Sequence, residues 1–270
     1  MTMPDWQIGA GTAPGFHHWR AYRNNQDAVV VNSRENALVA TVCDGCSQGA
    51  CSEVGAQLMA RFFSQRAMTM IQANENNRFW FLAEAADRQV FLNTLLCSGE
   101  HYLDSLITGL QGDRTSQIQS MFLFTVLALI ITPVVSFVFG MGDGVFQINN
   151  DYREIDEHNT PLYFGYRLLP SGLLDLDRDS LVFREHAALP TRQVNTVILA
   201  SDGALALQQR AGEVLKGGGS VGPLTQFESE ARYTRHKNAI NRRLNVLNLI
   251  NRKSHDDMSV VVVKRETSHA

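Results

Sequence analysis

Four acidic residues border apolar runs of the sequence, and their positions suit metal ligands. The run Ala37–Cys43 ends at Asp44, which a glycine follows. Asp143 and Asp202 also stand next to apolar runs and precede a glycine, while Asp256 stands just before the last apolar run of the chain. Runs of this length predict buried β-strands, which end at the edge of a sheet. We therefore expect the four carboxylates to converge on one site.

The chemistry that such a site supports is the binding of hard divalent cations. Carboxylate oxygens are the ligands that Mg²⁺ and Mn²⁺ prefer. Two such ions about 3.5–4 Å apart can hold a phosphate and a water, which then loses its proton easily and attacks phosphorus without a protein nucleophile. The chain has no P-loop, no G-x-S-x-G elbow and no H-E-x-x-H motif. The acids therefore indicate metal-dependent phosphate chemistry.

The composition narrows the class of protein. With 270 residues and 44% hydrophobic content, the chain can bury a large core in one domain or in two small ones. A net charge of -3 gives no sign of nucleic-acid binding. The N-terminal residues show neither the basic region nor the apolar region of a secretory signal, so we expect a cytoplasmic protein.

Three of the four cysteines, Cys43, Cys46 and Cys51, lie close together in the sequence. This is no disulfide framework for a chain of this length, and it favours a reducing compartment. The alternative is a zinc site that begins at Cys43 and Cys46. A fourth ligand at suitable spacing is missing, because Cys97 lies far downstream.

The segment Met121–Phe139 carries no charged residue and is nearly as long as a membrane-spanning helix, which needs about 20 apolar residues. Its content of Val, Ile, Phe and Thr, and the pair Thr132-Pro133 that divides it, favour two buried strands joined by a turn. No basic cluster flanks the segment to orient it in a membrane. We expect two strands and no stable membrane insertion, with a membrane protein as the alternative.

Two long helices are expected between the strands. One begins at Ser52, where apolar residues recur at helical spacing, and the other covers Asn77–Leu110, where Gly99 could interrupt it. Two consecutive helices favour a helical layer that covers a sheet. The other expected segments are a turn-rich stretch at Ile8–Arg23, strands at Ala28–Asn32, Tyr163–Leu168 and Met258–Lys264, a surface loop at Leu173–Pro190, and helices at Ala204–Leu215 and Gln226–Asn251.

The expected helix Gln226–Asn251 is basic on one side. Its cations include Arg232, Arg235, Lys237, Arg242 and Arg243. A solvated helix face is the simpler interpretation of these charges, and a docking patch for an acidic partner is the alternative.

The order of short motifs resembles that of the metal-dependent protein phosphatases of type 2C, in particular the compact bacterial members. The resemblance extends from about residue 15 to residue 264. The motifs that carry it are Asn25-Gln26-Asp27, Val42-Cys43-Asp44-Gly45 followed by Ser52-Glu53-x-Gly55-Ala56, Gly142-Asp143-Gly144, Leu199-Ala200-Ser201-Asp202-Gly203, and Asp256-Asp257-Met258-Ser259-Val260.

This resemblance implies an α+β fold, namely an αββα sandwich of two antiparallel sheets flanked by helices. We expect one such domain over residues 1–270, with its core at about 15–264 and a polar tail at 265–270. The resemblance also implies hydrolysis of phosphoserine and phosphothreonine by a hydroxide that bridges two Mn²⁺ or Mg²⁺ ions, with a weaker third ion site. The expected partner is a phosphoprotein substrate, with no nucleic acid, and the chain is expected to be a monomer.

The resemblance also implies roles for individual residues. Asp44 would bridge the two metals, and Asp27 would hold a metal-bound water. Asp143, together with Asp202, would match the third site. The metal ligands implied in this way are Asp44, Gly45, Asp202, Asp256 and Asp143.

One departure from the family pattern concerns the proton donor. Some members place a histidine where this chain has Cys46. A thiol is a poor proton donor to an alkoxide at neutral pH when compared with imidazole. The leaving oxygen would then take its proton from metal-bound water or from His17 or His18.

A second departure concerns the phosphate-binding arginine, whose usual position falls at Tyr22. Arg23 or Arg20 would replace it. The final acid pair, Asp256-Asp257, stands where Asp-Asn is commoner, and it adds negative charge near the metals. These departures leave a catalytically weak or inactive binding or regulatory module with this fold as the alternative to an active enzyme.

Overall fold

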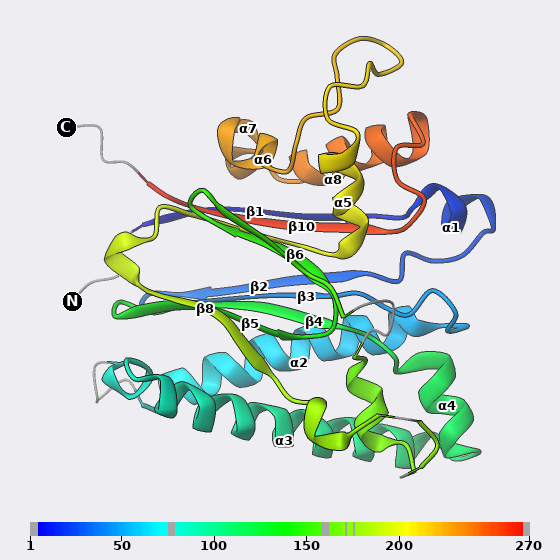
Figure 1. Cartoon of the computed structure of the whole chain (residues 1–270), viewed down its shortest axis with the longest axis vertical. Helices are drawn as coiled ribbons and strands as arrows, with labels where there is room; N and C mark the ends of the chain where they lie inside the picture. Colours follow the sequence, from blue (N-terminus) through cyan, green and yellow to red (C-terminus); the bar gives the residue numbers. More distant parts are fainter. Residues whose placement is uncertain (1–4, 75–78, 158–161, 171, 175, 267–270) are drawn as a thin grey trace.

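Two five-stranded antiparallel sheets lie face to face, and helices cover their outer faces (Figure 1). The computed structural model describes residues 5–74, 79–157, 162–170, 172–174 and 176–266. The first sheet has the strand order β1 (Trp6–Ala13), β10 (Met258–Arg265), β9 (Thr196–Ala200), β6 (Gly144–Ile148) and β7 (Asp151–Ile155). The second sheet has the order β2 (Ala28–Arg34), β3 (Ala37–Cys43), β4 (Val126–Ile131), β5 (Val135–Met141) and β8 (Arg184–Pro190).

Helices form the two outer layers, as Figure 1 shows. The second sheet is covered by α2 (Ser52–Gln72), α3 (Ala85–Leu110) and α4 (Arg114–Met121). The first sheet is covered by α5 (Leu205–Gln209), α6 (Gln226–Ser229), α7 (Arg232–Arg235), α8 (Ala239–Asn245) and the π-helical turn η7 (Val246–Ile250). The short helix α1 (Phe16–Arg20) lies at one end, and the 3₁₀ turns are η2 (Trp80–Leu82), η3 (Phe164–Leu168), η4 (Arg178–Ser180), η5 (Thr191–Gln193) and η6 (Asp202–Ala204).

The central strands alternate between two hydrophobic interiors. Leu38, Ala40 and Val42 of β3 belong to the cluster between the sheets, whereas Val39 belongs to the cluster under the helices. Because both faces are covered, every residue of β3, β4 and β5 is buried, and these strands read as continuous apolar runs. The expected αββα sandwich of two antiparallel sheets is therefore confirmed.

The uncharged segment Met121–Phe139 forms most of β4 and β5, which pair in antiparallel fashion through a turn at Thr132-Pro133. The prediction of two buried strands is confirmed. Among the described residues, no helix has the length and apolar character needed to cross a membrane.

Three expected segments are wrong in type. Ile8–Arg23 contains most of β1 and all of α1, because the glycines of β1 dilute the apolar pattern where α7 and α8 approach it. Leu173–Pro190 contains β8, an edge strand whose partly buried side chains give a weak apolar signal. Tyr163–Leu168 is not a strand: most of it forms η3, in which Phe164 stacks on Phe124.

The expected helices differ mainly in length. Gln226–Asn251 is broken into α6, α7, α8 and η7, with Asn238 in the left-handed region at φ 66° just before α8. The helix predicted at Ala204–Leu215 ends at Gln209. The predicted helix start at Asn77 lies outside the described residues, and α3 begins at Ala85.

Gly99 lies inside α3, which continues through it without a break. A Cβ at this position would lie 2.5 Å from Cε1 of Phe63 on α2, so the glycine allows the two helices to approach closely. Gly109 lies in the same helix, and a Cβ there would meet nothing within 4 Å. An alanine at Gly109 would change only the helix propensity, whereas an alanine at Gly99 would also change the packing of α2 against α3.

We expect Gly99→Ala to lower the free energy of unfolding by about 1–3 kcal/mol, because the added methyl group overpacks the contact with Phe63. Gly109→Ala is the matched control and should raise the free energy of unfolding by up to about 1 kcal/mol, since alanine is the better helix former. Urea unfolding followed by circular dichroism measures both effects. A stabilising effect of Gly99→Ala would contradict the packing described for α2 and α3.

Candidate metal centre

Strand pairing brings Asp27 and Asp44 together at one end of the second sheet. Ala28, the first residue of β2, pairs with Cys43, the last residue of β3. Asp27 and Asp44 are the next residues beyond this pair. Gly45, the predicted carbonyl ligand, is buried.

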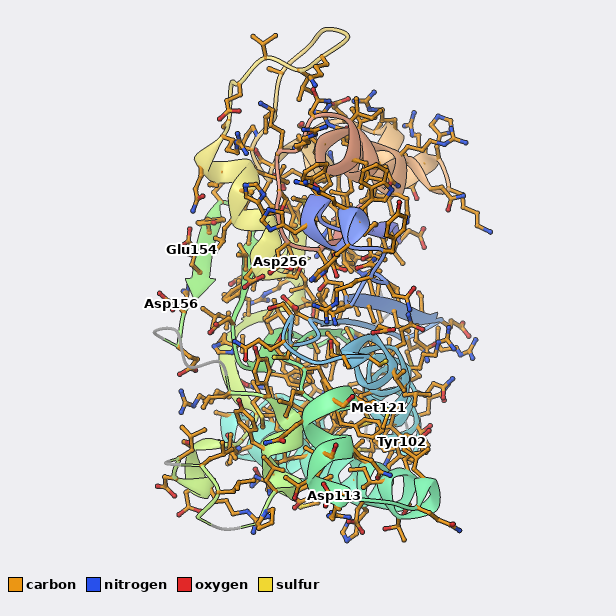
Figure 2. The ribbon with its side chains drawn as sticks, turned by 90° about the vertical axis from the view of Figure 1, so that its right-hand side faces the viewer. Tyr102, Asp113, Met121, Glu154, Asp156 and Asp256 are labelled. Atoms are coloured by element: carbon orange, nitrogen blue, oxygen red, sulfur yellow. The ribbon has the colours of Figure 1, made fainter. Side chains whose placement is uncertain are left out.

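The first sheet brings its acids to the same end of the sandwich. Ala200 of β9 pairs with β10 on one side and with β6 on the other. Asp202 follows β9, Asp256 precedes β10, and Asp143 precedes β6, so all three stand at this end. Figure 2 looks onto the end and shows Asp256 near its middle, between the two layers. The register of the strands therefore places the acids at one end of the sandwich, as the sequence predicted.

The carboxyl groups are close enough to raise one another's pKa. Removal from water raises the pKa of Asp44 well above its ordinary value, and the charges of Asp27, Asp202 and Asp256 raise it further. Burial and the charge of Asp202 also raise the pKa of Asp143, although a hydrogen bond from a backbone N–H partly opposes this. Without a cation the site is therefore electrostatically strained.

Two buried carboxylate oxygens have no hydrogen-bond partner among the described residues. They are Oδ1 of Asp27 and Oδ1 of Asp202. Buried acceptors without a partner are costly, and a cation removes that cost. The acids at this end and the carbonyl of Gly45 offer hard oxygen ligands, which fit Mg²⁺ or Mn²⁺ better than a soft-ligand metal.

Asp27 is held by a residue from the opposite sheet. The hydroxyl of Ser201 donates to Oδ2 of Asp27 at 2.7 Å and accepts from the N–H of Ser259 at 2.9 Å. Burial raises the pKa of Asp27, and the charge of Asp257 adds to this, while the hydrogen bond from Ser201 opposes it. The sequence shows Ser201 only as part of a motif, and its contact with Asp27, far away in the chain, was not predicted.

Asp257 has a structural role that the sequence interpretation missed. Its Oδ1 accepts from the N–H of Gly15 at 2.6 Å, and its Oδ2 accepts from the N–H of Gln26 at 2.5 Å. A Cβ on Gly203 would lie 1.9 Å from the Asp257 carbonyl oxygen, so the turn after β9 packs directly on this backbone. The buried carboxylate thus joins three segments around the site instead of only adding charge. The doubled acid was the one sequence signal that pointed to it.

Two of the predicted catalytic side chains flank this core. Nδ1 of His18 lies 2.9 Å from Oδ1 of Asp257, and the carboxylate raises the pKa of this buried histidine. Ligand atoms of His18, Asp256 and Asp257 lie within 4.8 Å of one another. His17 lies outside this cluster, and its ring packs on His255 at 4.3 Å between centroids.

The predicted phosphate-binding residue Arg23 contacts the loop behind Asp44. Its guanidinium donates to the carbonyl of Ser47 at 2.6 Å and to the carbonyl of Gly49. Tyr22, at the position where the family pattern has arginine, is 98% exposed and contributes nothing to the site. The described contacts of Arg23 therefore order the loop.

The cysteines near the site do not form a metal cluster in the part of the chain that the structure describes. Cys43 and Cys46 are buried and free, whereas Cys51 is exposed. Cys46 and Tyr163 line the same pocket. This arrangement agrees with a structural role for the two buried thiols.

The family model described as protein phosphatase 2C matches residues 14–246. No curated protein sequence matches this chain significantly. Similar solved structures include the serine/threonine phosphatase Stp1 from Staphylococcus aureus, with 14% identity over 98% of this chain and 96% of that chain and a TM-score of 0.55. PppA, described as a key regulatory component of T6SS in Pseudomonas aeruginosa, has 15% identity over 98% and 100% with a TM-score of 0.53. The S. agalactiae serine/threonine phosphatase has 14% identity over 97% and 100% with a TM-score of 0.51. At these identities the structural likeness shows the fold.

The raised pKa of Asp44 makes a prediction about the metal-free protein. The folded state holds this proton more tightly than the unfolded chain, whose carboxyl titrates near 3.8. Stability without metal should therefore fall as the pH rises through the raised pKa, and it should stay low above it. We expect Asp44→Asn to increase the Tm at pH 8 in EDTA and to weaken this pH dependence.

Differential scanning fluorimetry between pH 5 and pH 8 measures both quantities. Asp87→Asn, which changes an exposed acid in the first turn of α3, is the matched control and should leave the pH dependence as it is. A lower Tm for Asp44→Asn than for the unchanged chain at pH 8 in EDTA would show that the carboxylate stabilises the fold.

Proposed function

This chain belongs to the protein phosphatase 2C family, and on that basis we propose that it is a metal-dependent phosphatase acting on phosphoserine and phosphothreonine in proteins. The observation that carries the proposal is the set of five acids at one end of the sandwich, two of which keep a buried oxygen without a partner. A purely structural role would not require so many mutually repelling carboxylates at one place. The binding of divalent cations would require them as ligands.

The proposed ligands of Mn²⁺ or Mg²⁺ are the side chains of Asp44, Asp202 and Asp256 and the carbonyl of Gly45. Asp44 would contact two ions, and Asp143 would serve a third, weaker site together with Asp202. When bound, the ions supply positive charge at the phosphoryl oxygens and activate a water molecule.

The remaining residues orient the reactants. With Oδ2 of Asp27 held by Ser201, its free Oδ1 accepts a hydrogen bond from the attacking water. Two N–H donors of the Arg23 guanidinium order the loop by bonding to its carbonyls, which leaves the other donors of the same group for a phosphate oxygen. His18 donates the proton that the leaving alkoxide needs, because its pKa is raised and Asp257 fixes its Nδ1.

We expect the purified protein to hydrolyse para-nitrophenyl phosphate and a phosphothreonine peptide only when Mn²⁺ or Mg²⁺ is added. Asp44→Asn should reduce this activity to background, since it removes the carboxylate proposed to contact both ions, while circular dichroism shows an unchanged fold. Asp87→Asn is again the matched control and should retain activity. Full activity in excess EDTA would overturn the proposal.

The role proposed for His18 predicts a dependence on the leaving group. A phosphothreonine peptide has a poor leaving group that needs a proton, whereas para-nitrophenolate leaves without one. His18→Gln should therefore lower kcat on the peptide by about 10²-fold or more, with a much smaller effect on para-nitrophenyl phosphate. Equal losses on both substrates would indicate that His18 only supports the structure around Asp257.

The second candidate is a non-catalytic module that binds metal or a partner through this fold. Two N–H donors of Arg23 are used by loop carbonyls, and position 22 holds a tyrosine where the family pattern has arginine. Both observations favour the module, because both reduce the number of guanidinium donors available to a phosphate. Calorimetric titration with Mn²⁺ alongside the turnover assay separates the two candidates. Tight Mn²⁺ binding without turnover would favour the module.

A further inference from the structure

The helical cover of the first sheet carries a long basic segment. Residues 231–255 contain seven of the chain's 24 lysines and arginines and no aspartate or glutamate. The chain as a whole has a net charge of -3, so this segment opposes the charge of the rest. We call residues 231–255 the basic segment. A stretch of one sign of charge concentrates ligands of the opposite sign.

Part of the basic segment encloses a groove of about 350 Å³ between α7 and α8. The residues that line it are Arg232, Tyr233, His236, Ala239, Arg242, Arg243 and Val246. The lining therefore combines three guanidinium groups with a floor of apolar atoms. A solvated helix face, the simpler interpretation of the sequence, does not require such a concavity.

The arginines of the groove are held in place in different ways. Arg232 donates to the hydroxyl of Tyr233 at 2.9 Å and pairs with Glu230 at 2.7 Å. Arg243 donates to the side chain of Gln226 and to the carbonyl of Ser220, both at 2.8 Å. These contacts fix both side chains and leave part of each guanidinium unused.

Arg242 is the unpaired member of the groove. Its side chain is exposed, and it makes no hydrogen bond or ion pair with the residues that the structure describes. Two anchored guanidinium groups beside a free one form a site for carboxylates, because arginine binds carboxylates through paired N–H donors.

The groove lies on the outer helical layer, and β1 runs beneath that layer toward the end of the sandwich that carries the acids (Figure 1). A Cβ on Gly9 would meet the carbonyl of Tyr233, one on Gly11 would meet Asn241, and one on Gly15 would meet Asp256. At about 3.3 Å per residue, the groove is roughly 13–20 Å from Asp256 along β1, so an extended peptide needs at least about four to six residues to reach from one to the other. Figure 2 shows the same order, with the orange helices above, α1 below them, and Asp256 lower still.

We propose that this groove docks an acidic segment of the phosphoprotein substrate, about five residues from the phosphorylated side chain. The proposal rests on the proposed phosphatase function for the identity of the partner. The charge of the groove selects carboxylates, and its distance from the acids sets the spacing. The basic segment continues toward the metal centre through Arg252, which lies over the ring of Phe16, and Lys253, which pairs with Glu213.

An acidic peptide fits the groove better than a nucleic acid does. Single-stranded nucleic acids bind largely by stacking of bases on exposed aromatic rings. Of the two aromatic rings that line the groove, Tyr233 is 2% exposed and is covered by the guanidinium of Arg232 at 4.8 Å from its centroid, and only the imidazole of His236 is exposed. The groove thus offers charge and hydrogen bonds from three arginines but only one small exposed ring for stacking.

The groove is tested without catalysis by fluorescence anisotropy of a labelled Glu-rich peptide that carries no phosphate. Arg242→Glu should weaken binding by at least about fivefold, and added salt should weaken it as well. Arg61→Glu, which changes an exposed arginine on α2 in the opposite helical layer, is the matched control and should leave affinity unchanged. Equal affinities of the Arg242→Glu and unchanged proteins, or tighter binding of a single-stranded oligonucleotide of equal charge, would overturn the proposal.

The link to the substrate is tested by steady-state kinetics with Mn²⁺. Phosphothreonine peptides carry a Glu block about five residues before or after the phosphothreonine, and in the reference peptides Gln replaces Glu. One Glu-block peptide should show a KM at least about fivefold lower than its reference, and Arg242→Glu should remove this difference while para-nitrophenyl phosphate hydrolysis stays unchanged. Equal KM values for the Glu-block and Gln-block peptides would overturn the docking of substrate in the groove. Absence of all hydrolysis would overturn the proposed function, and the anisotropy result would still show whether the groove binds acidic peptides.

Discussion

The arrangement of this protein depends on the mutual repulsion of carboxylates at one end of its two sheets. Removal from water and neighbouring charges raise the pKa of Asp27, Asp44 and Asp256 together. The strands β3 and β10, which precede Asp44 and follow Asp256 respectively, are almost entirely buried, so these acids cannot move apart to relieve the repulsion. Ser201 and the backbone N–H groups near the site satisfy only part of the acceptors. The fold therefore stores an unfavourable interaction that a cation would convert into a favourable one.

Most of the fold followed from local pattern, and the exceptions have physical causes. Strands covered on both sides, such as β3 and β4, are continuous apolar runs, and α2 repeats its apolar residues at helical spacing. The edge strands are harder to recognise: β1 contains glycines because helices lie close against it, and β8 is only partly buried. The helix expected at Gln226–Asn251 is broken by a left-handed Asn238, which no periodicity reveals.

The convergence of the acids was predictable because each stands at the end of a recognisable strand. The groups that hold them were not, because they act across long distances in the chain. Ser201 reaches Asp27 from the other sheet, and Asp257 reaches the N–H groups of Gly15 and Gln26. Such contacts depend on how one sheet packs against the other, and the pattern of residues within a single strand does not reveal this packing. The sequence could show that an acid was doubled but not what the second acid binds.

The division of the acids between the two sheets has a mechanical consequence. Asp27 and Asp44 extend from the second sheet, whereas Asp143, Asp202 and Asp256 extend from the first. An ion shared between the two groups of acids would link the two sheets at one end of the sandwich. Sliding of one sheet over the other would then require release of the ion, so occupancy would make the two halves of the sandwich unfold as one cooperative unit.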